Sequence, residues 1–128
     1  MKTRTDLVKG WLLKAESDLT NARLCLAAGQ ALDTVCFHAQ QAAEKYIKAH
    51  LLANEIEFPF IHNLEKLVEL CEQRDPSFQN IRTLSQGLTP YAVELRYDDE
   101  FWPSTDTARQ ALDAALAIKD FVMARSSE

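Results

Sequence analysis

The sequence predicts an all-α protein, an up-and-down bundle of four main helices with one or two short ones. Three observations support this fold class. Apolar residues recur at steps of three and four over long stretches, which is the period of a helix with one buried side. No stretch alternates apolar and polar residues as a half-buried strand would. Only three glycines and four prolines interrupt the 128 residues, and all of them except Gly10 fall between the helical stretches or at their ends.

The first two expected helices are the longest. Residues 5–28 form the first, and Gly29 ends it, because glycine commonly follows the last turn of a helix. Residues 32–54 form the second, and the tight connection makes the two helices antiparallel neighbours. We expect the apolar stripes of both helices to be buried: Leu7, Val8, Trp11, Leu12, Ala15, Leu19, Ala22 and Leu26, then Leu32, Val35, Cys36, Ala39, Ala43, Tyr46, Ile47 and Leu51.

A connection follows at residues 55–60, where a proline blocks a continuous helix. Its two aromatic residues, Phe58 and Phe60, are expected to cap one end of the core. A third helix is predicted to begin near His62 and to end near Arg74.

The second half of the chain is expected to hold a short helix over residues 78–88, ended by Gly87. Thr89 followed by a proline is a typical helix start, and predicts a further helix that carries Tyr91 and Arg96. Ser104 is expected to cap the last helix, which is rich in alanine.

Size and composition bound the class of protein. A chain of 128 residues, 47% of them hydrophobic, fits one domain spanning residues 1–128 with a core of its own. The net charge of −5 disfavours nucleic-acid binding over the whole surface, although a local basic patch is compatible with it. No apolar run is long enough to span a membrane, and the first residues lack a secretory apolar core, so we expect a cytoplasmic protein.

The cysteines and histidines do not have the spacing of metal ligands. We therefore expect no metal site and no cofactor. Three reduced cysteines are expected to be small core residues: Cys25, Cys36 and Cys71. Of the histidines outside the binding candidates, His50 is expected to pack in the core and His62 to cap a helix or lie at the surface.

Two polar groups are candidates for ligand or partner binding. On the second helix a polar stripe lies beside the buried one, and it is either a binding surface or a solvated side. Its members are His38, Gln41, Lys45 and Lys48. The second group is Arg96 with Tyr97, which suits recognition of a phosphate and a base by paired hydrogen bonds and stacking. The alternative is that Arg96 is paired with Glu94, with Asp99 or with the next helix.

With these residues in view, the chain resembles the HEPN domain family. The resemblance covers nearly the whole chain, and the stretch from Cys36 to Ala49 is its most specific part. Four further segments agree with it: Trp11-Leu12-x-x-Ala15-x-x-Asp18-Leu19-x-x-Ala22, His62-Asn63-Leu64-x-x-Leu67, Tyr91-x-x-Glu94-x-Arg96-Tyr97, and the alanine-rich last helix.

The resemblance implies a helical bundle that usually forms a homodimer. Such proteins are often encoded beside a minimal nucleotidyltransferase, as a two-component, toxin–antitoxin-like module. Many members are metal-independent ribonucleases that use an arginine followed four to six residues later by a histidine. In this sequence no histidine stands at that spacing after Arg96, where Phe101 and Trp102 lie instead.

Two functional hypotheses follow. In the first, the protein is a non-catalytic binding module that contacts a nucleotide, RNA or a nucleotidyltransferase through five residues: His38, Gln41, Lys45, Arg96 and Tyr97. In the second, it is a divergent ribonuclease toxin in which His38 and Arg96 are catalytic. The first is favoured, because arginine stays protonated and the histidine that would transfer protons is missing from its usual place. The pair Phe101 and Trp102 is interpreted either as a dimer contact or as part of the core.

Overall fold

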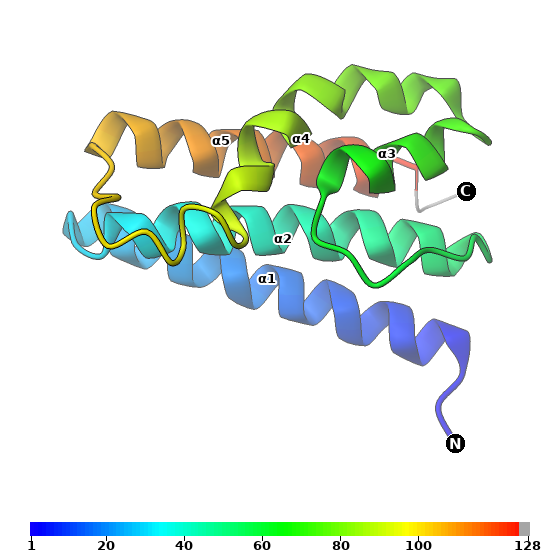
Figure 1. Ribbon diagram of the computed structural model, residues 1–128. Helices are drawn as coiled ribbons and strands as arrows, with labels where there is room; N and C mark the ends of the chain where they lie inside the picture. The colour runs from blue at the N-terminus through cyan, green and yellow to red at the C-terminus, as the bar shows by residue number, and fades with distance from the viewer. Residues whose placement is uncertain (126–128) are drawn as a thin grey trace.

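The computed structural model describes residues 1–125, which contain five α-helices, two 3-10 helices and no strand. The elements are α1 (Arg4–Ala28), α2 (Leu32–Ala53), α3 (Leu64–Glu72), η1 (Pro76–Ile81), α4 (Arg82–Leu88), η2 (Thr89–Tyr91) and α5 (Thr105–Met123). The three long helices lie roughly along one direction, and the short ones cover the side of α2 away from α1 (Figure 1). The predicted all-α helical bundle is confirmed.

The first two helices form an antiparallel hairpin. α1 begins with a capping box, in which Thr3 Oγ1 accepts from the Asp6 N–H at 3.1 Å and Asp6 Oδ2 accepts from the Thr3 N–H at 3.0 Å. It ends at Gly29, whose φ of 66° lies in the left-handed region that glycine adopts without strain. Ala31, with a φ of 52°, also lies in that region. The chain therefore reverses within three residues, as the sequence predicts.

α2 is the central helix of the bundle. It lies between α1 and α5, and α3 crosses its other side (Figure 1). Twelve of its 22 residues are buried, so this helix has no fully solvated side. Most buried positions are apolar, but three are polar, namely Gln40, Glu44 and Lys48.

One polar contact joins the three long helices. The Tyr46 hydroxyl on α2 donates a hydrogen bond to the Glu16 carboxylate on α1, which also pairs with Lys119 Nζ on α5 at 2.7 Å. The hydrogen bonds from Lys119 and Tyr46 lower the pKa of Glu16, whereas burial and the nearby carboxylate raise the pKa of Tyr46. The carboxylate therefore stays ionised and the hydroxyl stays protonated at neutral pH.

The N-terminal half of α1 stands apart from the bundle. Burial along this helix begins only at Ala15, and α1 diverges from α2 toward its N-terminus (Figure 1). Leu7, predicted to lie in the buried stripe, is 41% exposed, and Leu13 is 72% exposed. The apolar period correctly indicates a helix here, but its stripe is only partly covered before Ala15, since Val8, Trp11 and Leu12 are half-buried.

The predicted helix carrying Tyr91 and Arg96 is wrong. Only one 3-10 turn, η2, forms there, and turns follow over residues 92–97. The reason is that Thr89 serves other elements: its Oγ1 accepts from the Leu64 N–H at 3.2 Å and donates to the Ser85 carbonyl at 3.1 Å. Thr89 thus caps α3 and closes α4.

Smaller differences concern the helix ends and the aromatic connection. Gly87 lies within α4 and does not end it, and α3 ends at Glu72. Phe58 packs partly against the core, but Phe60 is 94% exposed, so the prediction that both cap the core is wrong for Phe60.

The cysteines and His50 have the packing roles predicted for them. Cys36 and Cys71 are buried and Cys25 is half-buried, all as free thiols. Burial raises the pKa of the Cys36 thiol to about 11 and that of the Cys71 thiol to about 12, so both are protonated and unreactive at neutral pH. His50 packs against Phe78, with their ring centroids 4.7 Å apart, and burial lowers its pKa.

Candidate ligand-binding surface

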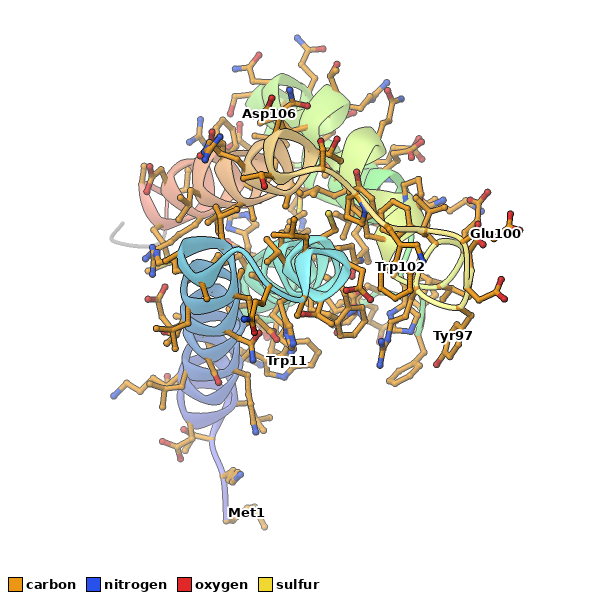
Figure 2. All side chains as sticks on the ribbon, turned by 90° about the vertical axis from the view of Figure 1, so that its left-hand side faces the viewer. Met1, Trp11, Tyr97, Glu100, Trp102 and Asp106 are labelled. Carbon is orange, nitrogen blue, oxygen red and sulfur yellow. The ribbon has the colours of Figure 1, made fainter. Side chains whose placement is uncertain are left out.

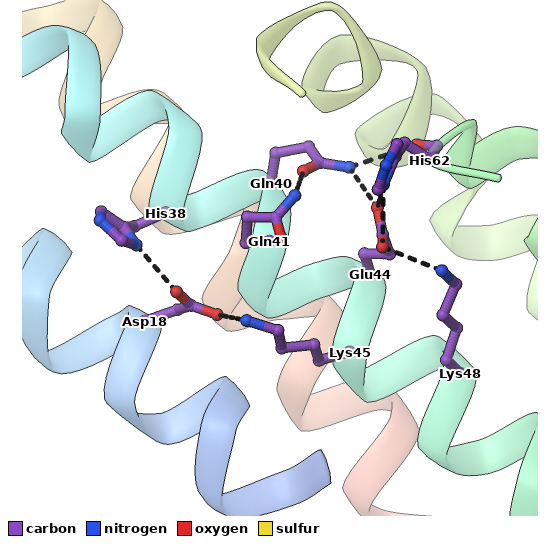
Figure 3. Close-up of polar contacts among 8 residues, drawn as sticks. All are labelled: Asp18, His38, Gln40, Gln41, Glu44, Lys45, Lys48 and His62. Carbon is purple, nitrogen blue, oxygen red and sulfur yellow. Dashed lines mark hydrogen bonds and ion pairs between the residues drawn. The ribbon is translucent and has the colours of Figure 1, made fainter. Parts of the chain in front are cut away.

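Asp18 on α1 organises two of the predicted binding residues. His38 Nδ1 lies 2.8 Å from Asp18 Oδ1, and Lys45 Nζ lies 2.5 Å from Asp18 Oδ2 (Figure 3). Asp18 is 8% exposed, whereas the His38 and Lys45 side chains are 26% and 24% exposed. A buried carboxylate therefore holds two nitrogen-bearing groups at the surface, each about one helical turn from Gln41 on α2.

The ionised state of Asp18 is stabilised by these two neighbours. Burial alone would raise the pKa of the carboxyl group, but hydrogen bonds from His38 and Lys45 outweigh burial and leave the pKa below its ordinary value. The carboxylate is consequently charged at neutral pH, and it fixes the orientation of both side chains.

Replacing Asp18 by the isosteric asparagine is expected to lower the free energy of unfolding by about 1–3 kcal/mol at neutral pH, because charged hydrogen bonds are lost. A lowered pKa in the folded state contributes stability above the unfolded-state pKa of about 3.9, and this contribution is lost as the pH falls through the folded-state value. Urea unfolding of the protein and of Asp18→Asn should therefore converge only as the pH falls below the lowered folded-state pKa of Asp18. A stability difference that persists at acidic pH would contradict this account.

The aromatic ring of Phe37 on α2 connects Arg96 with His38. Its guanidinium carbon lies 4.1 Å from the centroid of the Phe37 ring, and 5.6 Å from that of Tyr97. The Phe37 ring in turn contacts the His38 ring edge-on, with centroids 5.2 Å apart. The two predicted groups, far apart in the sequence, are thus connected through Phe37.

The donors of Arg96 are not used in ion pairs within the described chain. None of the ion pairs among residues 1–125 includes Arg96, so the alternative pairing with Glu94 or Asp99 is not observed. Tyr97 is 78% exposed and points away from the helices (Figure 2). A guanidinium stacked on a ring keeps its in-plane N–H groups available to an anion.

Lys48, predicted to belong to the polar stripe, is instead buried, with 3% exposure. Its ammonium lies 3.0 Å from Glu44 Oε2, and Glu44 is also buried, with 4% exposure. Glu44 accepts further hydrogen bonds from Gln40 at 3.0 Å and from His62 Nδ1 at 2.9 Å (Figure 3). The prediction of a solvated stripe is therefore wrong at Lys48, and the lysine belongs to an interior network.

The same network attaches the connection before α3 to α2. Gln40 Nε2 donates to the His62 carbonyl at 3.2 Å, while Gln40 Oε1 accepts from Gln41 Nε2 at 2.7 Å. Asn63, not His62, caps α3, and His62 lies at the surface as expected, with its side chain 47% exposed and its Nδ1 atom paired with Glu44. Gln41 thus orients the buried amide and is itself half-buried.

Three residues of this surface were not predicted, namely Asp18, Phe37 and Glu44. Two of them had a signal in the sequence. Asp18 interrupts the apolar stripe of α1 next to Leu19, and Glu44 precedes Lys48 by one helical turn. A charged residue inside a buried stripe normally has a partner, because an unpaired buried charge is strongly unfavourable.

In residues 1–125, no three His, Cys, Asp or Glu side chains converge closely enough to hold a metal ion. None of the helices described is both long and apolar enough to cross a bilayer.

The fold and the sequence together identify the family. The HEPN domain model matches residues 8–125. The crystal structure of ST0689, described as an archaeal HEPN homologue, is 26% identical, with a TM-score of 0.75 over 98% of each chain. The crystal structure of TT1696 from Thermus thermophilus is 27% identical, with a TM-score of 0.79 over 91% of this chain and 95% of that one. None of the curated proteins matches the chain. The chain belongs to the HEPN domain family.

Proposed function

We propose that this HEPN domain is a cytoplasmic, non-catalytic binding module. It forms a homodimer that binds a nucleotide or a partner minimal nucleotidyltransferase in a two-component, toxin–antitoxin-like system. The observation that carries this proposal is the continuous row of side chains Tyr97, Arg96, Phe37, His38, Asp18 and Lys45.

The chemistry of this row suits a phosphate with an attached base. The Arg96 guanidinium, stacked on Phe37, can donate two parallel hydrogen bonds to phosphate oxygens. Lys45, which follows His38 by two turns of α2, supplies a compact positive charge. The exposed ring of Tyr97 offers a flat apolar surface on which a base can stack. The same groups suit an acidic surface on a protein partner.

The residues that follow Arg96 support a binding role over a catalytic one. No histidine follows Arg96 at the spacing that the family's ribonucleases use. The Nδ1 atom of His38 is engaged by Asp18, and the Phe37 ring contacts both His38 and Arg96. General acid–base catalysis requires a proton-transfer group within hydrogen-bond reach of the reacting atoms, beside the group that stabilises phosphate charge.

The homodimer part of the proposal is supported by the second of the two adjacent aromatic residues, Trp102. Phe101 stacks on Tyr91, with centroids 5.7 Å apart, so it belongs to the packing of this chain. Trp102 is 75% exposed and points outward (Figure 2). Exposed tryptophans are enriched in protein interfaces.

Arg96→Ala is expected to weaken binding about tenfold or more, because charged hydrogen bonds to phosphate are lost. The measurement is isothermal titration with adenosine and guanosine triphosphates, together with pull-down of the nucleotidyltransferase encoded beside the gene, where there is one. Arg109→Ala is the matched control, since Arg109 is an exposed arginine on α5 whose partner, Asp106, lies on the same helix. Unchanged binding by Arg96→Ala would exclude the assigned surface.

One observation favours the second candidate, a metal-independent ribonuclease. A histidine held by a buried carboxylate is oriented as a general base would be, and His38 has this arrangement with Asp18. RNA cleavage in the presence of a chelator, lost in His38→Ala and retained through further purification, would replace the binding module by this enzyme.

A further inference from the structure

A groove opens between the free N-terminal half of α1 and the side of α2. Its volume is about 540 Å³, within the range of small-molecule sites. Trp11 lies in the angle between the two helices (Figure 2), and Lys45 forms part of the groove's wall. The groove therefore adjoins the row of side chains that runs from Tyr97 to Lys45. The α1 residues that line the groove do not belong to that row.

Trp11 is the aromatic platform of this groove. Its side chain is half-buried, and its ring centroid lies 5.8 Å from the ammonium of buried Lys48, which helps to hold the ring in place. The preceding Gly10 also lines the groove, and a Cβ atom added there would meet nothing within 4 Å. Space for a planar group is therefore open beside the tryptophan.

The groove is positively charged on a negatively charged protein. Residues 1–14 contain four basic side chains and one acidic one, whereas the whole chain has a net charge of −5. Lys2 and Lys14 line the groove and are exposed. The single carboxylate, that of Asp6, accepts the Thr3 N–H at 3.0 Å and so serves the helix cap. Two exposed ammonium groups thus flank an aromatic ring.

We propose that this groove binds a nucleotide unit, with its base against Trp11 and its phosphate at Lys14, which lies one helical turn further along α1. A concave site with one ring and two cations matches a ligand that combines a planar base with an anion. A flat anionic membrane would instead contact the outer side of the helix. The inference rests on the proposed binding function, because Lys45 belongs to both surfaces, but the contacts on α1 are separate from Arg96. Free nucleotides and nucleotides within a single strand share this chemistry.

The test uses the full chain with Trp102→Phe, so that Trp11 is the only tryptophan and reports on the groove. Adenosine monophosphate and a short single-stranded oligoadenylate are the two probes, and inorganic phosphate is the control without a base. We expect the bases to quench Trp11 fluorescence. Lys14→Ser should weaken binding and reduce the slope of log affinity against log salt for the oligonucleotide by about 0.7. Lys9→Ser, which removes an equal charge from α1 outside this groove, should have little effect.

A labelled oligoadenylate gives a second readout by fluorescence anisotropy, in which Trp11→Leu should weaken binding about tenfold. Binding of the strand without the monophosphate would identify the source as nucleic acid, and binding of both would include free nucleotides. Binding lost in Arg96→Ala but unchanged in Lys14→Ser and Trp11→Leu would overturn the groove and leave the proposed function intact. Binding only to phosphatidylglycerol vesicles, or to neither probe, would overturn the inference as well.

Discussion

Glu44→Ala is expected to lower the free energy of unfolding by about 3–5 kcal/mol. The carboxylate is the shared acceptor for Lys48, His62 and Gln40 in a region where Lys48 is only 3% exposed. Without it the ammonium is buried with no opposite charge, and the desolvation of that charge is no longer offset. Since whole domains are commonly stable by about 5–15 kcal/mol, one substitution removes a large part of the total.

Urea denaturation followed by circular dichroism measures this loss. The double variant Glu44→Ala with Lys48→Met is expected to recover much of the stability, because it removes the unpaired charge and keeps an apolar side chain of similar length. The exposed Glu69 on α3 is a matched control, and Glu69→Ala should change stability by about 0.5 kcal/mol or less. A loss of stability in Glu44→Ala as small as that in Glu69→Ala would show that the buried Glu44–Lys48 pair does not stabilise the fold.

Phe78→Ala is expected to cost about 3–5 kcal/mol of stability, as truncation of a buried phenylalanine typically does. Phe78 is fully buried at η1, and its ring meets Phe121 edge-on at 5.0 Å and His50 at 4.7 Å. The Arg125 guanidinium covers the same cluster, 3.4 Å from the centroid of Phe121. The cavity left by alanine would separate η1 from both α2 and α5.

Thermal and urea unfolding of Phe78→Ala should be compared with those of Phe60→Ala. Phe60 is the same residue type but is 94% exposed, so its truncation is expected to change stability by about 0.5 kcal/mol or less. Equal effects of the two substitutions would show that the packing around η1 does not determine stability.

The long helices could be predicted because their evidence is local. The apolar period of α2, the glycine after α1 and the serine cap at Ser104 each specify a helix or its end without reference to the rest of the chain. The segment after Thr89 was wrongly predicted to be a helix for the opposite reason, because its structure depends on a distant part of the chain. A threonine before a proline has the pattern of an N-cap, but its hydroxyl is taken by the distant Leu64 N–H.

The candidate site was predictable in part. Arg96 and the polar stripe of α2 could be selected by residue type, but the ring that connects them could not, because Phe37 has its role only once the loop after η2 folds back onto α2. Lys48 is the opposite case, because its burial could not be predicted from its residue type or its position on the helix. Periodicity placed it with His38 and Lys45, yet the connection before α3 covers it, and no property of α2 alone indicates that cover.

The tight reversal between α1 and α2 also bears on how the protein is made. Only three residues separate these helices, so their pairing needs a small loop closure and can occur while the rest of the chain is still in the ribosome. α5 pairs with α2 across all the intervening elements and emerges much later. A nascent chain that has formed this hairpin therefore exposes the apolar side of α2 that α5 later covers.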